Sequence, residues 1–262
     1  MSKLVIPATG QWKRIEKIGD ATLYLGDCIE ILPTLGKVDA VITDPPYGVT
    51  ACDWDVVAVM ADMWAGIEHC TSPDSPLVFT AQQPFTTDLI AGRRDWFRHS
   101  WVWDKQFAGC FATCNQQPMK VHEDILVFGR KGVFYAPQKE IRRDAIKLGG
   151  KMRSITSPLA SEFPASKVYE DKYPTSIIEL SNRSEKRGSH PTQKPVKLMQ
   201  YLAKTYSAED GTILDPFMGS GTTGVACANL GRKFIGIEIE PKYFEIACER
   251  IDNAYRQERL FS

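Results

Sequence analysis

Short apolar runs alternate with longer amphipathic stretches along most of the chain, a pattern typical of an α/β domain with a mostly parallel sheet. The apolar runs predict seven strands, at Ala21–Leu25, Val38–Thr43, Leu77–Ala81, Ser100–Trp103, Asp124–Phe128, Thr212–Leu214 and Phe234–Glu238. The amphipathic stretches predict five helices, at Val56–Cys70, Pro84–Ala91, Pro195–Tyr206, Gly221–Leu230 and Pro241–Tyr255.

The middle of the chain departs from this alternation. The 262 residues include 32 Lys and Arg and 32 Asp and Glu, so the formal net charge is zero and no global basic field attracts nucleic acid. Residues 131–197, however, hold 14 basic against 7 acidic residues, together with Gly149-Gly150 and several prolines. Since sustained apolar periodicity is missing there, we expect an irregular basic insert.

Composition sets further limits. Hydrophobic residues make up 43% and aromatic residues 10% of the chain, which argues against intrinsic disorder. Seven cysteines without regular spacing favour free thiols in a reducing compartment, and their spacing predicts no zinc site. Neither a leader peptide nor an apolar run of membrane-spanning length is visible, so we expect a soluble, cytoplasmic protein without a metal.

The first candidate site is the tetrapeptide Asp44-Pro45-Pro46-Tyr47, which follows a strand of buried type. Two prolines fix φ and remove two N–H donors, so the turn is stiff and its carbonyl groups stay free to accept hydrogen bonds. The Asp44 carboxylate and the Pro45 carbonyl would form a rigid pair of acceptors, with the ring of Tyr47 beside them. Because ligands of open α/β sheets bind at the carboxyl ends of strands, the turn predicts a site for an amino group on a flat ring.

The second candidate site is a glycine-rich loop between a predicted strand and a predicted helix, Asp215-Pro216-Phe217-Met218-Gly219-Ser220-Gly221-Thr222-Thr223-Gly224. A phosphate-binding P-loop would need a lysine after Gly221, where this chain has Thr222. The glycine spacing matches a dinucleotide fingerprint, but Asp215 would lie badly beside a pyrophosphate. The acid favours a cationic ligand group instead.

A third acid completes this pattern, because the next predicted strand ends in Glu238, 17 residues after Gly221. A carboxylate in this position can bind ribose hydroxyls. S-adenosylmethionine carries an ammonium, a carboxylate and a ribose, and no phosphate. The sequence therefore predicts this cofactor.

Together, the tetrapeptide and the glycine loop resemble the DNA amino-methyltransferases, which modify N6 of adenine or N4 of cytosine. The tetrapeptide precedes the loop with the basic insert between them, an order similar to that of the family's beta group. The resemblance implies a Rossmann-like, seven-stranded, mostly parallel sheet with circularly permuted motifs. It implies a catalytic half at residues 1–130, an irregular target-recognition insert at 131–189 and a cofactor-binding half at 190–262.

The resemblance also assigns roles to single residues. Asp44, Pro45, Pro46 and Tyr47 would be catalytic: the Asp44 carboxylate and the Pro45 carbonyl would accept hydrogen bonds from the target amine, while Tyr47 stacks on a base flipped out of the duplex. The implied cofactor-binding residues are Asp27, Cys28, Asp44, His190, Lys194, Asp215, Phe217, Gly219, Ser220, Gly221, Thr222 and Glu238.

Within this set, Asp27 would contact the adenine of the cofactor, and the segment His190–Pro195 would close over its methionine end. The segments Trp101–Lys105 and His122–Phe128 resemble strands that line the pocket of the target base. Double-stranded DNA is the implied partner, with a homodimer expected; the sequence does not indicate whether a restriction endonuclease accompanies the protein. The DNA-binding candidates are the basic residues of the insert, Arg142, Arg143, Lys147, Lys151, Arg153, Arg183, Lys186 and Arg187.

Several functions stay open at this point. Asp44 begins the tetrapeptide, whereas many cytosine-N4 members of the family carry Ser there, so we expect adenine-N6 methylation with cytosine-N4 methylation as the alternative. A protein glutamine methyltransferase is less favoured, because its tetrapeptide usually begins with Asn. A silent DNA-binding module is less favoured because the tetrapeptide and the glycine loop are both intact.

Overall fold

The computed structural model describes residues 5–6, 12–47, 60–109, 111, 114–148, 167–182 and 193–261. The chain divides into two compact units. The larger unit comprises Met1–Ala136 and Ser176–Ser262, and the smaller unit comprises Pro137–Thr175.

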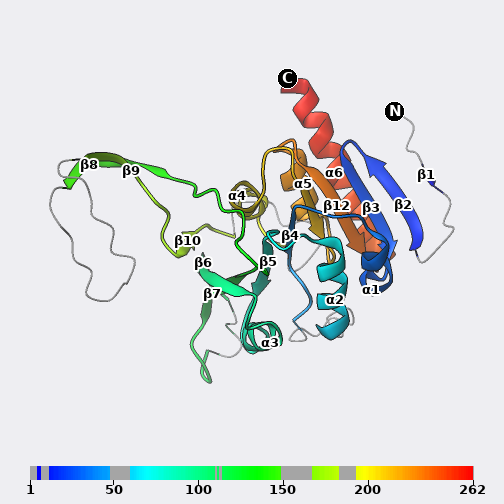
Figure 1. Cartoon of the computed structure of the whole chain (residues 1–262), viewed down its shortest axis with the longest axis horizontal. Helices are drawn as coiled ribbons and strands as arrows, with labels where there is room; N and C mark the ends of the chain where they lie inside the picture. The colour runs from blue at the N-terminus through cyan, green and yellow to red at the C-terminus, as the bar shows by residue number, and fades with distance from the viewer. Residues whose placement is uncertain are drawn as a thin grey trace. The chain divides into compact units, whose positions relative to one another are not determined.

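A ten-stranded mixed sheet forms the framework of the larger unit, with the strand order β1-β2-β3-β12-β11-β4-β5-β7-β6-β10 (Figure 1). All seven predicted strands are present, and they are the seven neighbours that run from β3 to β6, which confirms the expected Rossmann-like sheet. Strands β1, β2 and β10 extend it at its two edges and were not predicted. The strands are β1 Val5–Ile6, β2 Trp12–Ile18, β3 Ala21–Gly26, β4 Ala40–Thr43, β5 Leu77–Ala81, β6 Phe97–Gly109, β7 Lys120–Phe128, β10 Ile177–Glu179, β11 Thr212–Asp215 and β12 Lys233–Glu238.

Strand direction determines where a site can form. Strands β3, β12, β11, β4 and β5 run parallel, and β7 is antiparallel to β5. The carboxyl ends of the five parallel strands therefore meet at one edge of the sheet, the usual place for a ligand. Four acids lie at or just after these ends, in the spatial order Asp27, Glu238, Asp215 and Asp44.

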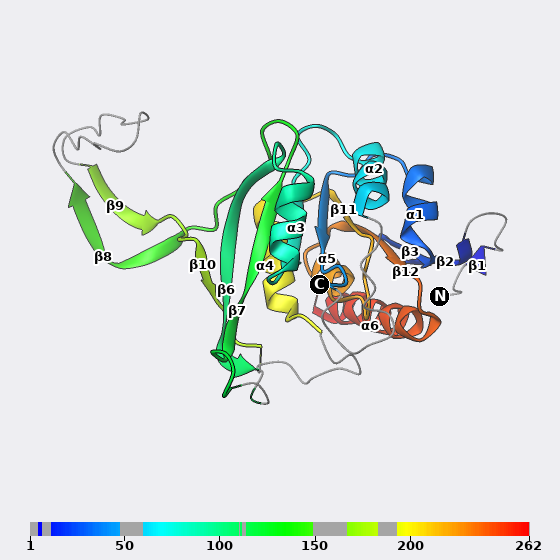
Figure 2. The same cartoon turned by 90° about the horizontal axis from the view of Figure 1, so that it is seen from below.

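Helices cover both faces of this sheet (Figure 2). On one face, α1, α2 and α3 bury a cluster that includes Trp64, Phe79 and Phe128. On the other face, α4, α5 and α6 bury a cluster that includes Leu202 and Phe244. Burying a large apolar side chain contributes about 1.5–3 kcal/mol, so these two layers hold the strand ends in place. The helices are α1 Cys28–Ile31, α2 Met60–Cys70, α3 Phe85–Gly92, α4 Val196–Tyr206, α5 Thr222–Ala228 and α6 Pro241–Phe261, with a short 3₁₀ turn at Leu32–Thr34.

The smaller unit contains a two-stranded antiparallel sheet formed by β8 (Glu140–Leu148) and β9 (Lys167–Lys172). Ion pairs of 2.8 Å from Lys139 to Asp171 and from Lys172 to Glu140 add charge pairing at one end of the two strands. The insert is therefore less irregular than expected, because charged residues hide the strand alternation. Ile177–Glu179, which the insert prediction included, forms β10 beside β6 in the larger unit.

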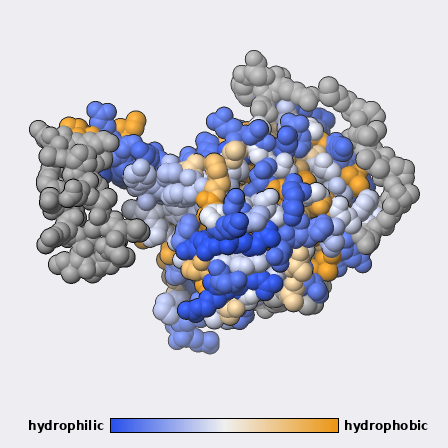
Figure 3. Space-filling view, in the orientation of Figure 1, coloured by the Kyte–Doolittle hydropathy of each residue, from blue (hydrophilic) through white to orange (hydrophobic). Residues whose placement is uncertain are grey.

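The surface visible in Figure 3 is largely hydrophilic, in keeping with apolar residues collected between the sheet and its helices. Among the described helices, none combines the length and the apolar character needed to cross a bilayer. The five cysteines that the structure describes are all free thiols.

Candidate active site

The Asp44 carboxylate lies directly after β4 and is held on both of its oxygens. Its Oδ1 accepts hydrogen bonds from the Tyr47 hydroxyl at 2.6 Å and from the Thr80 hydroxyl, and its Oδ2 accepts one from the Lys194 ammonium at 2.7 Å. Thr80 belongs to the neighbouring strand β5. Because three side chains from different elements grip the carboxylate, its orientation at the end of the strand is defined.

The Tyr47 ring packs against Phe85, with 5.4 Å between ring centroids and an interplanar angle of 30°. The Lys194 ammonium lies 5.5 Å from the Tyr47 ring centroid. Burial, reinforced by the charge of Asp44, raises the pKa of Tyr47 well above its ordinary value, so the phenol stays a neutral donor. Its stacking on a target base stays a prediction.

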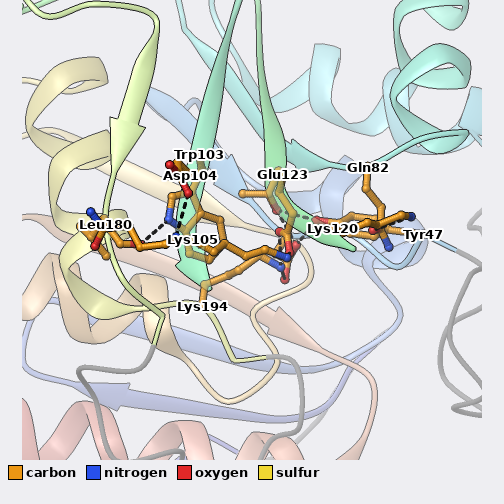
Figure 4. Close-up of polar contacts among 12 residues, drawn as sticks. Tyr47, Gln82, Trp103, Asp104, Lys105, Lys120, Glu123, Leu180 and Lys194 are labelled. Carbon is orange, nitrogen blue, oxygen red and sulfur yellow. Dashed lines mark hydrogen bonds and ion pairs between the residues drawn. The ribbon is translucent and has the colours of Figure 1, made fainter. Parts of the chain in front are cut away.

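Lys194 is a buried cation between two acids (Figure 4). Its ammonium lies 2.7 Å from Asp44 Oδ2 and 3.4 Å from Glu123 Oε2, while Lys105 binds Glu123 Oε1 at 3.1 Å. Burial opposes the charge on Lys194, but Asp44, Tyr47 and Glu123 hold its pKa well above the ordinary value. The resemblance assigns Lys194 to the cofactor, whereas the structure places its ammonium on the proposed catalytic acid.

Glu123 was not predicted as a site residue of its own, although it lies in the segment His122–Phe128 that was expected to line the target-base pocket. Burial opposes its ionisation, yet Lys194 and Lys105 hold its pKa below the ordinary value. The site therefore contains two carboxylates and two ammonium groups, drawn from β4, β6, β7 and the start of α4.

Asp215 ends β11 and is buried, with 2% of its surface exposed. Its oxygens accept hydrogen bonds from the Thr43 hydroxyl at 2.6 Å, the Thr223 hydroxyl at 2.7 Å and the Phe217 N–H at 3.1 Å. Burial raises the pKa of Asp215 to about 6. Since Thr43 immediately precedes Asp44, its hydrogen bond with Asp215 links the glycine loop to the turn Asp44–Tyr47.

Glu238 holds the other side of the glycine loop. Its Oε2 accepts the Gly219 N–H at 2.9 Å and its Oε1 accepts the Glu240 N–H at 2.7 Å. Burial raises the pKa of Glu238 to about 7. Gly219 has a φ of +51° and Gly221 a φ of +78°, a conformation that favours glycine.

The loop also packs on α6. The sequence predicted this helix but not its contact with the loop. Arg250 donates to the Ser220 carbonyl at 2.6 Å and to the Ser220 and Thr222 hydroxyls at 2.8 and 3.2 Å. A Cβ on Gly221 would lie 2.8 Å from the Cβ of Ala247, so this glycine also permits close packing against α6. In the sequence, Arg250 stood out only as a basic residue on the buried side of an amphipathic helix.

The other predicted site residues lie partly within and partly outside the residues that the structure describes. Asp27 caps α1 by accepting the Ile29 N–H at 2.9 Å, and burial raises the pKa of the neighbouring Cys28 thiol to about 12, which keeps it protonated. Phe217 is half-buried beside the loop. Arg142 donates to the Asp171 carbonyl at 2.9 Å within the smaller unit. Arg143 and Lys147 fall on the backbone of β8, whereas the candidates outside the described residues are Lys151, Arg153, Arg183, Lys186, Arg187 and His190.

Residues 38–249 match the N6/N4 family described as DNA methylase, and the chain belongs to this family. The type II methyltransferase M.HpaI of Haemophilus parainfluenzae is 28% identical over 251 residues, which cover 90% of this chain and 76% of that protein. M2.DpnII of Streptococcus pneumoniae is 49% identical over 74 residues, 28% of each protein.

Solved structures show the same fold. The M1.HpyAVI–SAM complex is 25% identical, with a TM-score of 0.60 over 88% of this chain and 99% of that chain. The cytosine-N4-specific PvuII DNA methyltransferase is 18% identical, with a TM-score of 0.64 over 92% and 93%. The expected methyltransferase class is thereby confirmed.

Proposed function

We propose that the protein transfers a methyl group from S-adenosylmethionine to N6 of an adenine at a specific site in duplex DNA. Membership of the DNA methylase family supports the DNA substrate, and the S-adenosylmethionine complex of M1.HpyAVI supports the methyl donor. The observation that carries the adenine assignment is Asp44, held by Tyr47, Thr80 and Lys194 at the carboxyl end of β4.

The described residues fit the cofactor. The Glu238 carboxylate lies at the carboxyl end of β12, and each of its oxygens accepts one hydrogen bond, which leaves lone pairs for ribose hydroxyls. Phe217 offers a half-buried ring beside the glycine loop. Asp215 accepts three hydrogen bonds and is 2% exposed, so its main role is to position the loop.

When bound, S-adenosylmethionine supplies a methyl group that its sulfonium has already activated. The chain therefore has to orient the amine more than to generate a strong nucleophile. The Asp44 carboxylate and the Pro45 carbonyl accept hydrogen bonds from the two amine hydrogens, which withdraws the nitrogen lone pair from conjugation with the ring. Tyr47 stacks on the base and returns part of the free energy that flipping costs.

The basic insert binds the DNA around the target base. Arg142, Arg143 and Lys147 belong to β8. In the sequence, Lys151 and Arg153 lie between β8 and β9, and Arg183, Lys186 and Arg187 follow β10. Each phosphate that these residues neutralise should steepen the salt dependence of DNA binding by about 0.9 in log–log slope. The expected homodimer remains a prediction.

The test is identification of the modified base. The purified protein is incubated with S-adenosylmethionine and unmethylated DNA of high sequence complexity, and the digested nucleosides are identified by mass spectrometry. N6-methyladenine is the expected product, and Asp44→Ala should yield none. N4-methylcytosine as the only product would overturn the adenine assignment, and no modified base at all would overturn DNA as the substrate.

A further inference from the structure

The buried ion pair between Lys194 and Asp44 occupies the acceptor that a target amine needs. Lys194 Nζ lies 2.7 Å from Asp44 Oδ2, and only 8% of the lysine surface is exposed. The other oxygen of Asp44 already accepts the hydroxyls of Tyr47 and Thr80. An ammonium and an exocyclic amine are both N–H donors, so Lys194 stands in the position of the substrate's own donor.

A second carboxylate lies within reach of the same ammonium. Glu123 Oε2 is 3.4 Å from Lys194 Nζ, and in the described part of the chain this buried oxygen has no hydrogen-bond partner. Its sister atom Oε1 is held by Lys105 at 3.1 Å. At 3.4 Å this ion pair is longer than a normal charge-assisted hydrogen bond, so a closer approach of the Lys194 ammonium would strengthen it.

These distances define two positions for one cation. Figure 4 shows Lys194 extending between the strand that carries Glu123 and the turn that carries Tyr47. A small rotation of the lysine side chain would close the gap to Glu123 and open the gap to Asp44. The cation would stay buried and paired in both positions, and Glu123 would keep Lys105 as a partner while Lys194 lies on Asp44.

We propose that the Lys194 ammonium moves from Asp44 to Glu123 when the target base enters; we call this movement the handover. Glu123 is then a positioning residue for amine methylation. The inference rests on the proposed function only in requiring an amine as the methyl acceptor. With the base bound, Asp44 Oδ2 accepts the amine and Glu123 Oε2 accepts Lys194. When the product leaves, Lys194 returns and neutralises Asp44.

The first test is the rate of methyl transfer in a single turnover, with cofactor and DNA saturating. Glu123→Gln removes the charge that receives Lys194, so the ammonium stays on Asp44 and the rate should fall at least about tenfold, the effect of one misplaced charged contact. The affinity for S-adenosylmethionine should stay within about twofold. The matched control is Glu68→Gln, which also breaks an ion pair, with Arg130 at 3.3 Å, and should keep the wild-type rate.

The second test distinguishes the handover from a merely structural role by a double-mutant cycle. In the Lys194→Met background there is no cation to receive, so adding Glu123→Gln should change the rate by less than about twofold. In the Lys194→Arg background a cation remains, so adding Glu123→Gln should still slow the transfer. Equal slowing by Glu123→Gln with and without Lys194, or a wild-type rate in the single variant, would overturn the proposal.

If Glu123→Gln does not fold, Glu123→Asp keeps the charge and shortens the reach by one methylene. It should slow single-turnover transfer to a smaller extent, and a wild-type rate in this variant would also count against the handover. The adenine assignment fails separately: a wild-type protein that forms N4-methylcytosine would refute N6 specificity and leave the comparison between variants intact, because cytosine presents the same kind of amine.

Discussion

The protonation of Glu238 should control how tightly the protein binds its cofactor. Burial raises the pKa of this carboxyl to about 7, and its oxygens already accept the N–H groups of Gly219 and Glu240. Only the anionic form presents acceptors to both ribose hydroxyls at once. Protonation should therefore weaken binding within the physiological pH range.

The magnitude follows from the pKa. At pH 8 about nine tenths of the molecules carry the anionic carboxylate, and at pH 6 only about one tenth do. If binding requires the anion, the apparent Kd rises about tenfold between pH 8 and pH 6, equivalent to about 1.4 kcal/mol. The free energy of unfolding of the cofactor-free protein should change with pH in the opposite sense to cofactor affinity. The pKa of Glu238 in the folded protein lies above its ordinary value of 4.5. The stability that Glu238 contributes is therefore present at low pH and is lost as the pH rises through about 7.

The assay is isothermal titration calorimetry with S-adenosylmethionine at half-unit steps from pH 5.5 to 8.5, for the wild type and Glu238→Gln. Position 238 of the variant cannot ionise, so the variant retains only the pH dependence of the ligand and of other groups near the loop, such as Asp215. The difference between the two curves should follow a single proton with a midpoint near pH 7. Parallel curves, or a difference that is flat with pH, would refute the assignment of Glu238 to the ribose.

Three further predictions test other parts of the site. Asp44→Ala should reduce the rate of methyl transfer at least about a hundredfold, which is the scale of losing a positioned catalytic group. Calorimetry should show a cofactor Kd within about twofold of the wild type. A wild-type rate of transfer would contradict the catalytic role of Asp44. Gly221→Ala places a Cβ 2.8 Å from the Cβ of Ala247 at a φ of +78°, so thermal unfolding should show a loss of about 2 kcal/mol or more, and an unchanged melting temperature would contradict this packing. Arg250→Ala removes three contacts to the loop, so cofactor Kd should rise about tenfold, with Arg250→Lys intermediate; unchanged affinity in both would contradict the bracing role.

Local motifs made the centre of the site predictable. Asp44-Pro45-Pro46-Tyr47 and the glycine loop are contiguous in sequence, and their chemistry depends on neighbours within a few residues. The seven central strands were predictable for a related reason, since buried strands such as Leu77–Ala81 are continuous apolar runs. Strand β2 was missed because charged residues interrupt it, with Arg14 bonded to Glu16 along the same strand.

Long-range partners could not be predicted in this way. Thr43 and Asp215 are 172 positions apart in the sequence, and Lys194 and Asp44 are 150 apart. No local pattern records such pairs, because they arise only when the sheet brings β4 beside β11 and the start of α4 beside the catalytic turn. The assignment of Lys194 to the cofactor came from its sequence neighbours and stays a prediction, whereas its contact with Asp44 could be found only in the tertiary structure.

The hydrogen bond from Thr43 to Asp215 joins two adjacent parallel strands. Neighbouring strands lie about 4.8 Å apart, a spacing set by the backbone and not by the loops. The strand ends that carry Asp44 and the glycine loop therefore keep a fixed separation, which is a property of the sheet. Under the proposed function, substitutions in the smaller unit would change the DNA sequence that is recognised without changing this separation, so specificity and chemistry would be free to evolve separately.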